Sequence, residues 1–236
     1  MKISIAWGNR VISPLAKAWT FSILFGLVIL VGLFSGQSMK NFPIVSIKQE
    51  PMLKTLEGKK IAIIIAFKDF RDEEYFIPKE SFENKGVEVE TASTQKGTAI
   101  GIEGGEVEIN MTIGELDVMN FDAIIFIGGP GALEELDNEE SYSIIKETLM
   151  REKILAAICI SPVILAKSGV LSGKKATVWS SALDREAIQI LRVNNVIYRD
   201  QSVVVDGKII TADGPQSAKK FAEAILNILD KNSEIE

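Results

Sequence analysis

Short apolar runs alternate with stretches of helical periodicity along residues 57–236, and this pattern predicts an α/β domain. The apolar runs at 61–66, 121–127 and 153–158 predict buried parallel strands, because a strand covered on both faces shows no polar alternation. Strands that alternate with helices imply right-handed βαβ units and an open, mostly parallel sheet with helices on both faces. The other predicted strands are at 87–92 and 175–179, with two short strands within 97–109 and a hairpin over 203–211. Helices are predicted within 69–85 and at 138–150, 161–168, 183–192 and 216–229. Pro78 should interrupt or kink the first of these helices.

A long uncharged segment precedes this domain. Residues 18–39 carry no charged side chain and are long enough, as a helix, to cross a hydrocarbon layer of ~30 Å. Residues 1–17 contain three basic and no acidic side chains, which favours a cytoplasmic amino terminus and an extracytoplasmic domain. We therefore predict a single-pass membrane protein with a linker at 40–56. The alternative is a cleaved signal peptide with small residues at 36–38, which would give a secreted protein.

Charge and composition exclude several classes of function. Residues 1–55 hold six of the 26 basic and one of the 32 acidic residues, which leaves a net charge of −11 on the rest of the chain. An acidic domain argues against nucleic-acid binding, which needs clustered positive charge. The single cysteine cannot form an internal disulfide. Because the chain has no histidine, it cannot form a Cys-His dyad, a Ser-His-Asp triad or a histidine-ligated metal site, and we expect no metal and no cofactor.

The apolar run at 153–158 breaks at Cys159, and Ser161-Pro162 has the form of a helix start, with a capping hydroxyl followed by proline at the first helical position. Cys159 is therefore predicted on a tight strand-to-helix turn at the carboxyl end of a strand, where open α/β sheets bind ligands. The following helix N-terminus would favour a thiolate. The alternative is a buried structural cysteine, since free cysteine is among the most buried residue types.

Three predicted loops end strands that could neighbour the cysteine: 67–74, 128–131 and 211–215. A carboxyl from the acidic first loop would either stay protonated and donate a hydrogen bond to a thiolate, or raise the thiol pKa. A solvated helix start explains most of these acids equally well. The glycine-rich second loop could present amides to an oxyanion or be a plain turn. In the third loop, Asp213 either enters the site or, as we expect from general frequency, caps the terminal helix. The acids of the first loop are Asp69, Asp72, Glu73 and Glu74.

Three segments together resemble the ThiJ/PfpI superfamily: 156–162, 126–129 and 204–215, within a similarity that spans about 59–229. The resemblance implies a flavodoxin-like fold of the class I glutamine amidotransferase type, a homodimer, and a reactive cysteine at Cys159. It also implies a glutamate four residues before a proline, which here is Glu74. Gly129 and Ile160 match the backbone positions that bind an anion in this family.

The chain lacks the histidines that many members of the family carry near the cysteine. Members described as intracellular proteases carry histidine directly after the cysteine, where this chain has Ile160, and others carry one near the position of Trp179. Protease chemistry by a Cys-His pair is therefore excluded, and the same absence argues against glutamine amidotransferase chemistry, which needs a histidine base. A membrane segment before the domain is also unusual for the family.

Three hypotheses follow. The first is an enzyme of the glyoxalase or deglycase type, in which the Cys159 thiolate adds to a small reactive carbonyl and Glu74 transfers a proton. The second is a redox sensor or chaperone-like protein, in which Cys159 is oxidised to a sulfinate held by Glu74. The third is a protease-like homologue without the catalytic histidine that only binds partners. The acid and the glycine-rich turn favour the enzyme, although the sequence does not decide between the first two.

Overall fold

A computed structural model describes residues 56–232 of the chain, and every structural statement below concerns these residues. The predicted membrane segment at 18–39 and nearly all of the predicted linker at 40–56 lie outside the described residues. Within 56–232, no helix combines the length and the apolar character needed to cross a membrane.

The domain is built on a seven-stranded sheet in which six strands run parallel and one edge strand, β11, is antiparallel. The strand order is β11-β12-β8-β7-β1-β3-β6, so the three predicted apolar runs form the adjacent central strands. The strands are β1 (Lys60–Ile64), β3 (Glu88–Ser93), β6 (Met111–Thr112), β7 (Ala123–Phe126), β8 (Ile154–Ile158), β11 (Val203–Asp206) and β12 (Ile209–Ala212).

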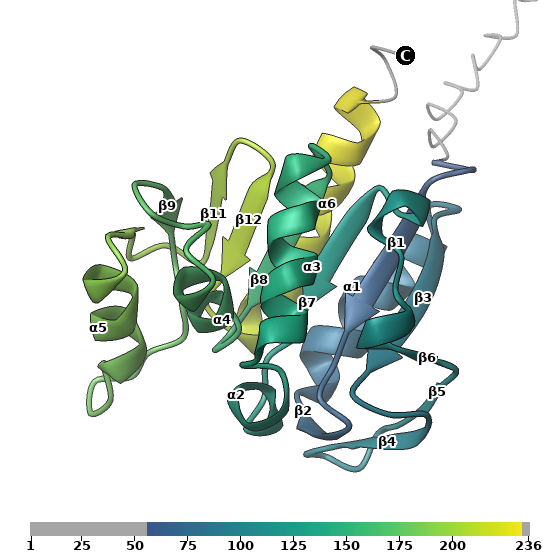
Figure 1. Cartoon of the computed structure of the whole chain (residues 1–236), viewed down its shortest axis with the longest axis horizontal. Helices are drawn as coiled ribbons and strands as arrows, with labels where there is room; N and C mark the ends of the chain where they lie inside the picture. The colour runs from purple at the N-terminus through teal and green to yellow at the C-terminus, as the bar shows by residue number, and fades with distance from the viewer. Residues whose placement is uncertain (1–55, 233–236) are drawn as a thin grey trace, which may run out of the picture. The chain divides into compact units, whose positions relative to one another are not determined.

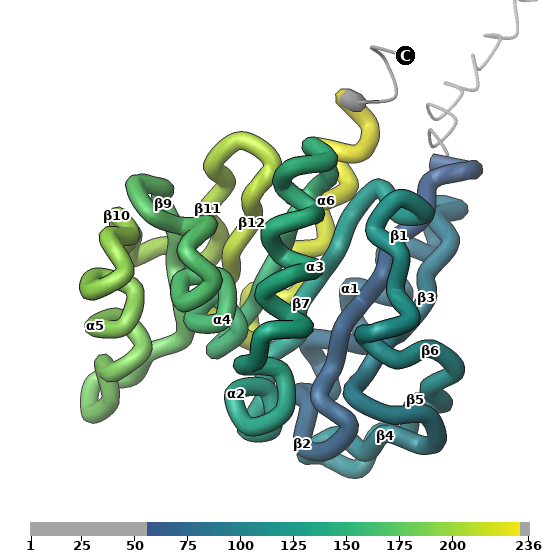
Figure 2. Tube along the Cα trace, viewed as in Figure 1, coloured from purple at the N-terminus to yellow at the C-terminus, as the bar shows by residue number. Residues whose placement is uncertain are grey.

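Helices cover both faces of this sheet, as the pattern of apolar runs predicts. Figure 1 shows α3 and α4 in front of the sheet and α1 and α6 behind it, and the tube in Figure 2 follows the same crossovers. The result is a doubly wound, flavodoxin-like α/β fold. The helices are α1 (Asp72–Glu83), α2 (Gly131–Glu135), α3 (Glu139–Met150), α4 (Pro162–Lys167), α5 (Glu186–Val193) and α6 (Ala218–Asn232), with short 3-10 turns at Ile113–Glu115, Val118–Asn120 and Pro215–Ser217.

The core is divided by the sheet into two apolar layers, and successive residues of each central strand enter opposite layers. In β1, Ile61 and Ile63 pack towards α1 and α6, whereas Ala62 and Ile64 pack towards α3 and α4. All four side chains are fully buried. This two-sided burial explains why the central strands read as continuous apolar runs, and it holds their carboxyl ends rigidly in one row.

A smaller sheet extends from the carboxyl edge of the main sheet. Its strands β2 (Lys68–Phe70), β4 (Gly97–Gly101) and β5 (Glu106–Ile109) contain the predicted excursion within 97–109 as an antiparallel hairpin. The Asp72 side chain, buried in the first turn of α1, accepts hydrogen bonds from the amides of Glu103 (2.8 Å) and Gly105 (2.7 Å). Asp72 therefore joins the tip of this hairpin to the start of α1.

Two predicted elements are shorter than their sequence pattern indicates. The strand predicted at 175–179 is only β9 (Lys175–Ala176), which pairs with β10 (Ile197–Tyr198), because the Thr177 amide donates instead to the Thr211 hydroxyl. The helix predicted from residue 183 begins at Glu186, because the Ser181 hydroxyl holds the preceding amides in a turn.

The predicted interruption at Pro78 is wrong, since α1 continues through it to Glu83. Proline removes only the amide that would bond to the carbonyl of Glu74 in the first turn. Pro78 also shares the buried face of α1 with Tyr75 and Phe82. Packing of this face against the sheet therefore keeps the helix continuous.

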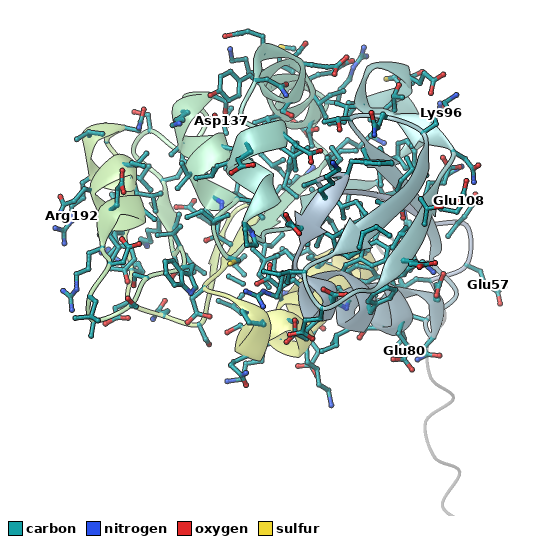
Figure 3. The ribbon with its side chains drawn as sticks, turned by 90° about the horizontal axis from the view of Figure 1, so that it is seen from below. Glu57, Glu80, Lys96, Glu108, Asp137 and Arg192 are labelled. Atoms are coloured by element: carbon teal, nitrogen blue, oxygen red, sulfur yellow. The ribbon has the colours of Figure 1, made fainter. Side chains whose placement is uncertain are left out.

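The Asp72 contact gives a stability prediction. We expect Asp72→Ala to lower the free energy of unfolding by about 1–3 kcal/mol, because two amides near the hairpin tip lose a charged acceptor. Equilibrium denaturation in urea measures this loss. The control is Glu80→Ala in the same helix, where the side chain is exposed and points away from the domain in Figure 3. An equal loss in both variants would contradict the role of Asp72.

Candidate active site

Cys159 occupies the turn between β8 and α4, as predicted, in a left-handed backbone conformation with φ of 64°. Two long-range hydrogen bonds fix this turn. The Cys159 amide donates to the carbonyl of Ala212 at 2.9 Å, and the Cys159 carbonyl accepts from the amide of Trp179 at 2.8 Å. A non-glycine residue with positive φ is strained, so these bonds hold the side chain in a direction that the turn alone would disfavour.

The predicted capping role of Ser161 is wrong, although Pro162 does begin the helix. Ser161 has a helical backbone conformation, and its hydroxyl donates to the carbonyl of Ile127 at 2.8 Å. Ser161 thus joins the elbow to the end of the neighbouring strand β7 and caps no helix amide.

Glu74 reaches the cysteine from the first turn of α1. Its side chain is fully buried, and one carboxyl oxygen accepts a hydrogen bond from the Gly128 amide at 3.1 Å. A hydrogen-bonding interaction with the Cys159 thiol lowers the pKa of the same carboxyl, and its buried Oε1 has no other hydrogen-bond partner within the described residues. The structure therefore brings together the two side chains that sequence reasoning selected.

Glycine is required where the loop after β7 passes between these side chains. A Cβ on Gly128 would lie 2.5 Å from the Cβ of Cys159 and 2.8 Å from a carboxyl oxygen of Glu74. At Gly129, which has φ of 114°, a Cβ would lie 2.5 Å from the backbone nitrogen of Arg71. The loop amides reach the site only because neither residue carries a side chain.

Two backbone amides act on the sulfur. The amides of Gly129 and Ile160 each lower the pKa of the Cys159 thiol, as donors to a sulfur do, and these are the two positions predicted to bind an anion. Such a pair of donors favours negative charge on the sulfur or on an oxygen formed beside it. The arrangement fits the predicted oxyanion site, and its catalytic role stays a prediction.

Burial dominates the acid–base properties of the pair. Desolvation raises the pKa of Glu74 to about 7, although the cysteine hydrogen bond, the Gly128 amide and the charge of Arg71 oppose the rise. Burial, followed by the charge and the hydrogen bond of Glu74, also raises the pKa of the Cys159 thiol. The predicted thiolate is therefore not the favoured form at rest, because burial outweighs the two amides and α4 has only six residues.

A cavity of about 230 Å³ opens at the sulfur. Apolar side chains form most of its wall, and the one charged side chain that lines it is Arg71. Sequence reasoning did not select Arg71, because nothing in the spacing of loop 67–74 shows which charges face inward. Cys159 is only 8% exposed, so a ligand reaches the sulfur through this cavity. The lining residues are Arg71, Gly129, Pro130, Leu133, Cys159, Ile160 and Trp179.

None of the other predicted candidates lines the cavity. Asp69 is exposed, Asp72 binds the hairpin tip described above, and Glu73 is half-buried. Asp213 accepts a hydrogen bond from the Ser217 hydroxyl. Among the described residues, no group of three or more cysteine, aspartate or glutamate side chains is arranged to hold a metal ion.

Comparison with known proteins agrees with this geometry. Residues 59–228 match the DJ-1/PfpI family, and the chain belongs to this family. An uncharacterized protein of Methanocaldococcus jannaschii is 40% identical over 182 residues, which cover 77% of this chain and 87% of the relative. A deglycase of Pyrococcus furiosus is 31% identical over 167 residues, 71% of this chain and 98% of the relative. A ThiJ/PfpI domain protein from Brachyspira murdochii has a crystal structure that superposes with a TM-score of 0.70 at 34% identity, over 75% of this chain and 98% of that protein.

The raised pKa of Glu74 predicts how stability depends on pH. The folded protein retains a proton on Glu74 up to about pH 7, whereas the unfolded chain loses it near pH 4.5. The folded state therefore binds more protons between these values, and its stability falls as pH rises through this window, by about 3 kcal/mol.

Urea denaturation of the wild type and of Glu74→Gln between pH 4.5 and pH 8 measures this dependence. We expect the fall in stability to be smaller in Glu74→Gln, which has no proton to lose at this position. The exposed substitution Glu80→Gln is the control and should keep the wild-type slope. Identical slopes in all three proteins would contradict the buried carboxyl as the cause.

Proposed function

We propose that this domain is an enzyme of the glyoxalase or deglycase type, which converts small reactive carbonyl compounds through Cys159 and Glu74. The observation that carries the proposal is a sulfur held between a buried carboxyl and two amide donors at a small cavity. The family membership and the deglycase among the relatives support the same reaction class.

The first step is addition of the sulfur to an aldehyde. Glu74, in its ionised form, accepts the thiol proton while the bond between sulfur and the carbonyl carbon forms. The π electron pair moves to the carbonyl oxygen, which the amides of Gly129 and Ile160 stabilise as its charge develops. Return of the proton to this oxygen gives a hemithioacetal. A pKa of about 7 suits a group that accepts and returns protons near neutral pH.

For a 2-oxoaldehyde, the same carboxyl completes the reaction. Glu74 moves the proton from the carbon bonded to sulfur to the neighbouring carbonyl oxygen, which gives an enediol. It then moves the hydroxyl proton of the sulfur-bearing carbon to the adjacent carbon, which gives a thioester. Water then hydrolyses the thioester, so that a 2-hydroxy acid leaves and the thiol forms again. The net change is the addition of one water molecule, without an external oxidant or reductant. In a chain without histidine, Glu74 is the acid–base group in contact with the sulfur.

A redox sensor is the second candidate, and the unpartnered Oε1 of Glu74 favours it. Two molecules of peroxide oxidise a thiolate to a sulfinate and are reduced to water. A protonated Glu74 has a hydrogen bond to donate to a sulfinate oxygen. Conversion of peroxide-treated protein to a stable sulfinate without any carbonyl turnover would favour this candidate over the enzyme.

We further propose that residues 18–39 anchor the protein in a membrane with the domain on the extracytoplasmic side, and that the domain forms a homodimer. The length of the uncharged segment and the basic residues before it support the anchor. The homodimer rests on the family resemblance.

The enzyme proposal predicts that wild-type protein converts methylglyoxal to lactate and that Cys159→Ser and Glu74→Gln each lower kcat/KM by at least about 100-fold. The activity should fall as pH drops below about 7, because Glu74 then carries a proton and cannot accept one from the thiol. Lactate formation measured across pH tests both statements. Glu80→Gln in the same helix should retain wild-type activity, and turnover that survives Cys159→Ser would exclude the mechanism.

The anchor predicts that the full-length protein stays in the membrane pellet after alkaline carbonate extraction. Removal of residues 1–39 should release the domain into the supernatant, because the apolar segment is then lost. Protease added to intact cells after removal of any outer layer should digest the domain if it is extracytoplasmic. Recovery of a mature chain that begins near residue 38 would support signal cleavage instead.

A further inference from the structure

The wall of the cavity at Cys159 is mainly apolar and carries one charged side chain. Pro130, Leu133, Ile160 and Trp179 present mainly carbon atoms, whereas Arg71 presents a permanent positive charge. The one carboxyl in contact with the sulfur, Glu74, is fully buried behind it and does not line the cavity. A ligand in this cavity therefore meets a single full charge, and that charge is positive.

The backbone of Arg71 is fixed beside the reacting atoms. Its amide donates to the carbonyl of Gly128 at 3.0 Å, and the close approach of Gly129 leaves no room for a Cβ between the two chains. The amide of Gly129 in turn acts on the sulfur of Cys159. The backbone of Arg71 is thus hydrogen-bonded to Gly128, the residue next to Gly129, whose amide is a donor of the proposed oxyanion site.

The guanidinium group of Arg71 is only weakly paired among the described residues. Its Nη1 lies 3.8 Å from a carboxylate oxygen of Glu103, which is 56% exposed, so solvent weakens this ion pair. The Nε donor is shielded from solvent and has no hydrogen-bond partner within the described residues. A guanidinium carries several donors in one plane, and a carboxylate can accept two hydrogen bonds from such a group. A guanidinium with one weak ion pair therefore gains from an anionic acceptor in the cavity.

We propose that Arg71 makes this site selective for small carbonyl compounds that carry a carboxylate. The carboxylate binds the guanidinium group of Arg71 while the carbonyl carbon lies at Cys159. This inference rests on the proposed function for its substrate chemistry, whereas the selectivity for anions is a property of the cavity and is testable without turnover. Because the cavity is only about 230 Å³, the substrates are short-chain compounds.

The single cysteine of the chain allows a direct test with two alkylating reagents of nearly equal shape. Iodoacetate carries a carboxylate and iodoacetamide is neutral; each forms a bond between sulfur and its methylene carbon as iodide leaves, and the thiol proton passes to Glu74 or water. Rates are measured on the folded full-length protein by mass spectrometry. The readout is the ratio of the iodoacetate rate to the iodoacetamide rate, which cancels any common change in thiol reactivity.

We expect Arg71→Gln to lower this ratio by about 10- to 100-fold and Arg71→Lys to lower it less, because lysine keeps the charge without the paired donors. Arg151→Gln is the matched control, since it makes the same charge change at the end of α3 before β8, the opposite edge of the sheet. A ratio that stays within about twofold in Arg71→Gln, an equal fall in Arg151→Gln, or no alkylation of folded protein by either reagent would overturn the inference.

A second measurement compares two substrates, 4,5-dioxopentanoate, which carries a carboxylate, and the uncharged 2-oxopentanal. We expect the wild type to favour the anionic compound in kcat/KM by about 10-fold or more, and Arg71→Gln to lose most of that preference. No cysteine-dependent turnover of either compound, together with the predicted alkylation ratios, would reject the proposed function and retain the anion selectivity. Turnover of both compounds with equal kcat/KM would reject the selectivity and retain the proposed function.

Discussion

The buried carboxyl of Glu74 is the constraint on which the rest of the site depends. A carboxylate without solvent must receive hydrogen bonds or take up a proton. Here the Gly128 amide supplies one hydrogen bond and the Cys159 thiol another, and the remaining energetic cost appears as a pKa raised to about 7. The surroundings of Glu74 therefore explain both the glycine at the end of β7 and the position of the cysteine at the end of β8.

The strained elbow depends on segments that are distant in the sequence. A left-handed conformation at a non-glycine residue costs roughly 1–2 kcal/mol. The hydrogen bonds of the Cys159 backbone to Ala212 and Trp179 offset that cost, and both partners are held by the fold rather than by the turn. The short β9 is part of this arrangement, because the chain leaves the sheet there and brings Trp179 to both the elbow and the cavity.

Much of the fold and the central pair of the site could be predicted from the sequence. Continuous apolar runs identify the central strands, because a strand buried on both faces has no alternation of polar and apolar residues. Glu74 was identified through the family resemblance, which implies a glutamate four residues before a proline, and the structure places it on the buried face of α1 with Pro78 and Phe82. The spacing does not reveal the role of Arg71, because its position beside the sulfur depends on the contact of its backbone with the loop after β7. Ser161 was mistaken for a cap because its hydroxyl finds a partner on a neighbouring strand, which no local pattern shows.

In the proposed mechanism of this histidine-free chain, Glu74 carries out each proton transfer at the sulfur. The proton affinity of Glu74 therefore decides whether the proposed reaction runs near neutral pH. Burial alone would raise the pKa of Glu74 further and leave the group protonated. The Cys159 hydrogen bond, the Gly128 amide and, after them, the positive charge of Arg71 oppose that rise. Arg71 therefore has two effects: it helps to keep Glu74 available as a base, and it attracts an anionic ligand to the cavity. A carboxylate bound to Arg71 would neutralise part of that charge and raise the proton affinity of Glu74. The charge that selects the ligand and the proton transfer that starts the reaction are thereby coupled through one side chain.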